Sequence, residues 1–340
     1  MSTIHFLNVL EGDCNIIQHD SGRVSVIDVS NAYNQADTEA EKRVRASEAR
    51  QIMRQRTMVP NGKIDYGQKK IPDNPIEYLS KHQITSIFRF IITHPDMDHL
   101  DGIRDLFESF SINCFWDTNN NKKITDFQGG GYNEEDWQFY TSIRDEKNTK
   151  VPRRSFLSQY YGDFFQQDFI HILAPTGDLV HEANRSSDYN DCSYVLLYTP
   201  PKANGQQWKI LFAGDSHDRT WDYILRTPAL RQLVQNVDVL LAPHHGRDSK
   251  RSYEFLKVVT PGVTLFGNAS HEHLAYNCYP ETRITNNQAG YVILDISEDA
   301  INFYVKNLEF ANNFARNPKR SGATPSFDAR MGAYLLGYLK

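Results

Sequence analysis

The chain has 340 residues, with 37 Lys and Arg against 42 Asp and Glu and a formal net charge of −5 at pH 7. A chain of this length can bury a sizeable core without staples, which argues against a disordered or collagen-like protein. The slightly acidic balance excludes a generally basic nucleic-acid-binding protein, so any nucleic-acid contact must be a local patch.

The opening of the chain reads as an antiparallel meander of three strands, over 4–9, 14–18 and 23–29, with Gly12-Asp13 and Ser21-Gly22 at the turns. Helices are expected over about 39–58, 74–82 and 99–110, with a strand at 86–93 between the last two. Further strands are expected at 169–173, 193–198, 208–213, 237–241, 263–267, 291–296 and 301–305. Many strands with interposed helices predict an α/β layered sandwich.

Composition gives only approximate domain boundaries. We expect one domain over 1–310, with insertions at about 31–82 and 119–167, and a polar C-terminal tail over 311–340. The aromatic residues of the second insertion suggest a lid or a partner surface rather than a base-stacking platform, which leaves a protein partner or a homo-oligomer open. No apolar run approaches the ~20 residues of a membrane helix. With no visible secretory signal and only scattered cysteines, a cytoplasmic protein without membrane contact is expected.

The strongest chemical signal is the run His94-Pro95-Asp96-Met97-Asp98-His99, at the end of a predicted strand. Loops at strand ends on a rigid scaffold are where functional sites gather. Imidazole nitrogens and carboxylate oxygens within six residues suit divalent metals, so the run predicts a metal site rather than a merely polar turn.

Three further motifs follow predicted strands. Asp215 comes after a glycine, where its carboxylate can reach inward and bridge two cations. Of the adjacent His244 and His245, one can bind a metal while the other donates a proton. Asp28 can hydrogen-bond the ligand loop, or simply start a turn.

The order of these motifs resembles the metallo-β-lactamase fold superfamily, and most of all the soluble hydrolase domain of ComEC-type DNA-uptake proteins. The motifs that carry the resemblance are FLNVLEGDCNIIQ, THPDMDHLDG, the segment Asn190-Asp191-Cys192-Ser193, AGD ending at Asp215, and VDVLLAPHHG. It covers about residues 4–300 and implies a four-layered αββα sandwich over the 1–310 domain.

The resemblance also implies a ligand set for two divalent ions, Mn, Zn or Mg. His94 and Asp96 would face one ion, Asp98 and His99 the other, and Asp215 would bridge them. The family's third-motif histidine is absent, and Asp191 is the better ligand of the Asn190-Asp191 pair. For the last motif, His271 and His273 lie nearby but do not match the pattern. The full list of expected ligands is His94, Asp96, Asp98, His99, Asp191, Asp215 and His244.

Two metals in such a site suit phosphodiester cleavage, because they clamp the attacking and leaving oxygens of an in-line displacement. Asp98 would orient the attacking water, and His245 (or His244) would protonate the leaving oxygen. Arg247 and Lys250, just after the HHG turn, are candidate phosphate contacts.

The leading expectation is therefore a phosphodiesterase or nuclease acting on DNA, with nucleic acid or a nucleotide as its substrate. Two alternatives stay open: a hydrolase of small esters or cyclic nucleotides, and a degenerate, non-catalytic binding or regulatory module.

Overall fold

The computed structural model describes residues 1–35, 37–55, 64–127, 132–248, 252–268, 273–316 and 324–340. Within them, the larger sheet has ten strands in the order β17-β18-β16-β15-β1-β2-β3-β5-β7-β8. Their bounds are β1 Ser2–Phe6, β2 Asn15–Gln18, β3 Val24–Ile27, β5 Arg89–Ile91, β7 Phe115–Trp116, β8 Arg153–Arg154, β15 Val292–Ile296, β16 Ile301–Val305, β17 Phe327–Asp328 and β18 Ala333–Leu339.

The smaller sheet has six strands in the order β14-β13-β12-β11-β10-β9. These are β9 Ile170–Ala174, β10 Val195–Tyr198, β11 Ile210–Phe212, β12 Val239–Leu241, β13 Val263–Phe266 and β14 Arg283–Thr285. Strands β11 to β14 run parallel to one another. A separate parallel pair joins β4 (Ser86–Ile87) and β6 (Ser111–Ile112).

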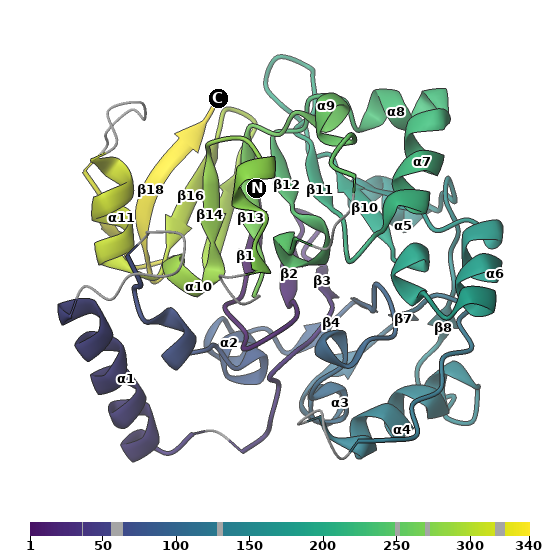
Figure 1. The fold of residues 1–340 in the computed structure, drawn as a ribbon, viewed down its shortest axis with the longest axis horizontal. Coiled ribbons are helices and arrows are strands. Elements are labelled where there is room, and N and C mark those ends of the chain that lie inside the picture. The colour runs from purple at the N-terminus through teal and green to yellow at the C-terminus, as the bar shows by residue number, and fades with distance from the viewer. Residues whose placement is uncertain (36, 56–63, 128–131, 249–251, 269–272, 317–323) are drawn as a thin grey trace.

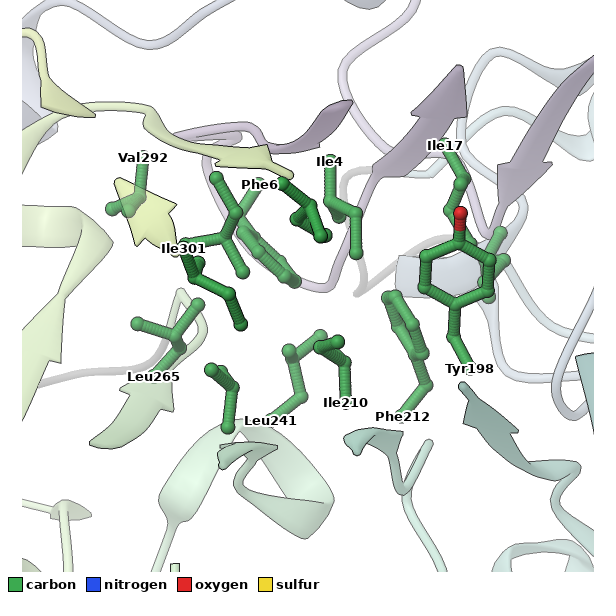
Figure 2. Packing of buried hydrophobic residues seen from close by; sticks show 14 of the residues in the cluster. Ile4, Phe6, Ile17, Tyr198, Ile210, Phe212, Leu241, Leu265, Val292 and Ile301 are labelled. Atoms are coloured by element: carbon green, nitrogen blue, oxygen red, sulfur yellow. The ribbon is translucent and has the colours of Figure 1, made fainter. Parts of the chain in front are cut away.

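The two sheets pack face to face over one apolar core. Figure 2 shows Ile4, Phe6 and Ile301 of the larger sheet above side chains of the smaller sheet, among them Leu241, Leu265, Ile210 and Phe212. Successive side chains of a strand point to opposite faces. Accordingly, Ile17 lies in this central core while its neighbour Ile16 packs into a second core on the outer face.

Helices cover both outer faces. Side chains from α2, α3 and α4 build the outer core of the larger sheet, and side chains from α7, α8 and α9 build that of the smaller sheet. The helices are α1 Glu39–Arg54, α2 Pro75–Lys81, α3 Ile103–Ser109, α4 Glu134–Arg144, α5 Asp163–Gln167, α6 Gly177–Ser186, α7 Asp218–Arg226, α8 Pro228–Leu233, α9 Leu256–Val259, α10 Asn286–Ala289 and α11 Leu308–Ala315. The layer order is αββα, so the expected metallo-β-lactamase sandwich is confirmed.

Some expected segments differ from the structure. The chain after residue 310 was expected as a tail, but β18 pairs with β16 and so extends the larger sheet. Five of the eight aromatic residues in the run at 137–165 pack in or against the cores, Trp137, Tyr140 and Phe165 fully and Phe139 and Phe156 in part. The other three, Tyr160, Tyr161 and Phe164, are exposed. Figure 1 shows α1 standing apart from the sheets at the lower left; the expected continuation of this helix to 58 lies outside the described residues.

No helix among the described residues combines the length and the apolar character that crossing a membrane requires.

Candidate metal centre

The parallel direction of neighbouring strands brings the polar motifs to one edge of the sandwich. β3 and β5 are parallel neighbours in the larger sheet, so Asp28 and His94, which follow them, lie at the same edge. β11 and β12 are parallel neighbours in the smaller sheet, so Asp215 and the two histidines at 244 and 245 lie together as well. The two edges meet where the backbone N–H of Tyr194 donates to the carbonyl of Thr93 at 2.9 Å.

The loop after β5 is held by Asp28. Its carboxylate accepts hydrogen bonds from the backbone N–H of Thr93 at 2.7 Å and from the Thr93 hydroxyl at 2.8 Å. The same carboxylate contacts Nδ1 of His99 at 2.9 Å, which leaves Nε2 of that ring facing the interior of the site. Asp28 therefore orients the loop and one imidazole, as the sequence suggested.

Six side chains converge on one small volume. Nε2 of His99 lies 3.5 Å from Oδ1 of Asp215, and Nε2 of His94 lies 3.8 Å from Oδ2. Nε2 of His245 lies 3.6 Å from Asp215 Oδ2 and 3.5 Å from Asp98 Oδ2. Oδ2 of Asp13 lies 3.3 Å from Nδ1 of His245. Asp215 thus has a carboxylate oxygen toward each half of the cluster.

This arrangement fits divalent cations. The Nε2 atoms of His94, His99 and His245 are buried and make no hydrogen bond, although each faces a carboxylate. Two ligands that are each ~2.0–2.2 Å from one metal lie roughly 3.0–3.6 Å apart, which is close to the spacing observed. The donors form three overlapping groups: His94, His99 and Asp215; Asp98, His99 and His245; Asp13, Asp215 and His245.

The electrostatics show how strongly these groups interact. Burial lowers the pKa of His99, but Asp28, Asp215 and Asp98 together raise it well above its usual value. Burial likewise lowers the pKa of His245, and Asp215 and Asp13 outweigh it, so this pKa is also raised. Burial would raise the pKa of Asp98, yet the neighbouring histidines lower it to about 2. The Asp98 carboxylate is therefore ionised over the physiological range, as a carboxylate metal ligand must be.

The two adjacent histidines occupy different surroundings. Both have left-handed backbones, with φ of 53° at His244 and 56° at His245, in the short 3₁₀ turn η4 (Pro243–Gly246). A non-glycine residue pays roughly 1–2 kcal/mol for this conformation. The His245 side chain is 2% exposed and lies within the donor groups, whereas that of His244 is 21% exposed, with Nε2 3.7 Å from Asp215. His245 thus lies within the donor groups, whereas His244 contacts Asp215 from a more exposed position and lines a neighbouring hollow.

Asp13 is a site residue that sequence reasoning passed over. It follows Gly12, whose φ is +74° and whose backbone packs against the carbonyl of Asp98; a Cβ there would come within 1.6 Å of that oxygen. Only glycine allows this approach, and the approach carries Asp13 to His245. The Gly12-Asp13 pair lies in the opening motif, but its sequence predicts only a turn.

Asp96 does not join the donor groups. One carboxylate oxygen lies 3.7 Å from Nε2 of His94, and the other accepts a hydrogen bond from the ammonium of Lys122. Burial would raise the pKa of Asp96, but His94 and Lys122 hold it well below its usual value.

Asp191 belongs to a different group. It forms a second donor cluster with Asp188 and His217, and its Oδ2 lies 3.5 Å from a guanidinium nitrogen of Arg219. These residues and His244 line a hollow of about 430 Å³ beside the centre.

The remaining candidates contribute less. Arg247 pairs through its backbone with Leu274 and lines neither of the hollows that border the centre. His273 accepts a backbone hydrogen bond from Asp248 through its own carbonyl. Lys250 and His271 lie outside the described residues.

Comparison with known proteins adds only distant likenesses. No family model and no curated protein matches the sequence. Among solved structures, Igni18, a metallo hydrolase from the archaeon Ignicoccus hospitalis, is 10% identical over 87% of this chain and 100% of its own, with a TM-score of 0.44. A diphosphatase of the PhnP family is 9% identical over 86% and 97%, with a TM-score of 0.36. The metallo-β-lactamase SMB-1 is 10% identical over 72% and 78%, with a TM-score of 0.34. At such values the fold assignment rests on the layers and topology described above.

Proposed function

We propose that this protein is a metal-dependent hydrolase of phosphodiesters. The observation that carries the proposal is the convergence of buried donors around Asp215, three of which are imidazole nitrogens without a hydrogen bond. When bound, divalent ions there would acidify a water molecule and offset the negative charge of phosphoryl oxygens. His94, Asp98, His99, Asp215 and His245 would hold them, with Asp13 beside His245.

Two side chains would orient the attacking water and protonate the leaving oxygen. Asp98 is partly exposed and is placed both to bind and to orient the attacking water. His244 takes the role of proton donor to the leaving oxygen in place of His245, because its ring is accessible from the hollow that borders the centre. His245 is fully enclosed by carboxylates and cannot reach a substrate without leaving them.

The donor set favours hard cations more than a typical zinc site does. Asp98 and Asp215 provide oxygen ligands beside three imidazoles, and the Asp13 carboxylate faces Nδ1 of one of these imidazoles, that of His245. Oxygen-rich sites shift preference toward manganese or magnesium, while imidazoles keep zinc competitive. We therefore propose two ions, with manganese the first to be tested.

The order of the motifs, similar to that of the ComEC-type hydrolase domain, supports a nuclease acting on DNA. One observation favours a second candidate, a hydrolase of small phosphoesters such as cyclic nucleotides. The hollow of about 430 Å³ is lined by Asp188, Asp191 and Asp218 against a single Arg219 among the described residues, and such an acidic wall repels a long polyanion.

An activity panel separates these candidates. The purified protein is assayed with added Mn²⁺, Mg²⁺ or Zn²⁺ on single- and double-stranded DNA, RNA, cyclic nucleotides and a generic phosphodiester. Asp215→Asn should lower turnover on the order of 10³-fold, because it removes several kcal/mol of charge stabilisation. His94→Ala and Asp98→Ala should behave alike.

The matched control is Asp299→Asn. Asp299 is exposed, in the turn between β15 and β16, and this turn lies at the strand end opposite the centre, since Ile296 pairs with Ser2. Full activity is expected in this variant. If the wild type and Asp215→Asn were equally inert on every substrate, the enzyme proposal would be wrong.

A further inference from the structure

The segment that follows β7 brings a lysine to the metal centre. The Lys122 ammonium donates a hydrogen bond to Oδ1 of Asp96, and its side chain is only 20% exposed. The Tyr189 ring lies beneath it, with the nitrogen 5.5 Å from the ring centroid. This contact joins residues 26 positions apart, so it is a feature of the tertiary fold rather than of a local turn.

The backbone around Lys122 is fixed on both sides. Its N–H donates to Oδ1 of Asn120 at 3.2 Å, and its carbonyl accepts from the Arg144 guanidinium at 2.8 Å. The Asn120 amide in turn donates to the hydroxyl of Tyr140, which is buried in α4. A long, flexible side chain that starts from such a rigid base loses less entropy when it binds a ligand.

A cavity of about 280 Å³ opens beside this lysine. Its walls combine the carboxylates of the metal loop with apolar and aromatic side chains from the same segment as Lys122: Asp96, Met97, Asp98, Lys122, Ile124, Asp126, Phe127 and Tyr132. Lys122 is the one basic residue among the described residues that line it. The cavity therefore combines one ammonium, three carboxylates (Asp96, Asp98 and Asp126) and an apolar wall, next to the place where metal ions would offset the carboxylate charge.

We propose that Lys122 binds an anionic oxygen of the substrate beside the metal centre, while the Ile124, Phe127 and Tyr132 wall takes the organic group attached to the phosphate. An ammonium has three N–H donors, and Asp96 takes one of them. The other two remain for phosphoryl oxygens, and Asp96 acts as a positioning residue that points the ammonium at the centre. This inference rests on the proposed phosphoesterase function.

The test measures equilibrium binding separately from turnover. Wild type, Lys122→Gln and Lys122→Arg are loaded with Mn²⁺, and the metal content per chain is determined by mass spectrometry. The affinity for inorganic phosphate is then measured by calorimetry. Lys123→Ala is the matched control, because Lys123 is the adjacent, exposed lysine.

Lys122→Gln should weaken phosphate binding at least 10-fold with unchanged metal content, and Lys122→Arg should restore much of the affinity. Where a phosphodiester is turned over, KM should rise more than kcat falls, and a neutral carboxylic ester should be unaffected. Lys123→Ala should match the wild type in every measurement.

Unchanged phosphate affinity in Lys122→Gln would overturn the inference, as would a wild type that binds no phosphate. A changed metal content would also overturn it, since Lys122 would then be a structural part of the metal centre. Loss of phosphate binding in Lys122→Gln, in a protein that turns over nothing, would leave the inference standing and refute only the proposed enzymatic function.

Discussion

Two buried polar clusters in this molecule differ in how their charges are satisfied. In the first, Arg89 donates to Asp168 at 2.6 Å and to the Ser25 hydroxyl at 3.0 Å, and Arg23 donates to Asp168 at 3.0 Å. In the metal centre, by contrast, the Nε2 atoms of His94, His99 and His245 stand 3.5 to 3.9 Å from the carboxylate oxygens that they face.

The difference teaches what each cluster is for. The Arg89 cluster brings the two terminal guanidinium nitrogens to hydrogen-bonding distance of their acceptors, and it ties the β2–β3 hairpin and β5 to the segment just before β9. The centre gathers as much charge but keeps it just beyond hydrogen-bonding distance, an arrangement that a cation would complete. One cluster ties strands of the fold together, whereas the other has the spacing that the proposed cations require.

The sharpest way to break this comparison is to truncate the structural cluster. Arg89→Ala leaves the carboxylate of Asp168 inside the protein without its main partner; Asp168 and Arg89 have side chains 0% and 1% exposed. Loss of one member of a buried ion pair costs about 3–5 kcal/mol. Urea unfolding at pH 7 should show this loss, while metal content stays unchanged.

Arg154→Ala, an exposed arginine of β8, is the control and should cost little. A loss of metal from a folded Arg89→Ala protein would mean that the two clusters are not separate.

A second test concerns Asp117, a buried carboxylate that is hydrogen-bonded and yet costs free energy when it is ionised. Burial raises the pKa of Asp117 to about 6, even though Arg153, Ser155 and Tyr140 hydrogen-bond its carboxylate. Between about pH 4 and 6 the unfolded chain loses this proton while the folded protein keeps it, so the free energy of unfolding falls as pH rises. The full effect is up to about 3 kcal/mol.

Asp117→Asn removes this titration. Relative to the wild type, its stability in urea should therefore improve steadily from pH 4 to 7. A stability difference that is independent of pH would show that Asp117 is ionised throughout this range.

Adding metal tests the candidate metal centre directly, because only the cluster that binds a cation should respond. A cation that binds only the folded state adds about 2.7 kcal/mol at 100 times its Kd. Thermal unfolding with and without Mn²⁺ should show this increment in the wild type and in Arg89→Ala, but not in Asp215→Asn. An equal increment in all three proteins would place the bound metal elsewhere.

The smallest expected effect is that of changing Asp28, which supports the candidate ligand His99 and is not itself a ligand. Asp28→Asn keeps the hydrogen bond from Thr93 but weakens the contact with Nδ1 of His99. Changes at such supporting positions typically cost 10- to 100-fold in metal affinity. Competition with a chelator measures this loss; unchanged affinity would mean that the loop orients His99 without its help.

The sequence predicts the layers and much of the sandwich edge that carries the candidate metal centre, since the strand pattern is regular and the motifs follow strand ends. Parallel neighbours then bring Asp215 and His245 together without further information. The different surroundings of His244 and His245 were not predictable, because they depend on successive left-handed backbones. Side-chain direction also escaped prediction at Asp191, which turns to Arg219.

Other misses have a different cause. Asp13 and Lys122 reach the centre through contacts between segments distant in sequence, which no local pattern records. The aromatic run at 137–165 looks like an appended lid, because its periodicity does not distinguish a core helix from a surface one; burial of Trp137 and Tyr140 in α4 decides the matter.

The spread of the donors along the chain has a consequence for when the centre can form during synthesis. The donors span the chain from Asp13 to His245, and they come from both sheets. A nascent chain still on the ribosome cannot assemble this centre until β12 and the turn after it have been made. Metal uptake during synthesis would therefore report the docking of one sheet on the other, rather than the folding of either alone.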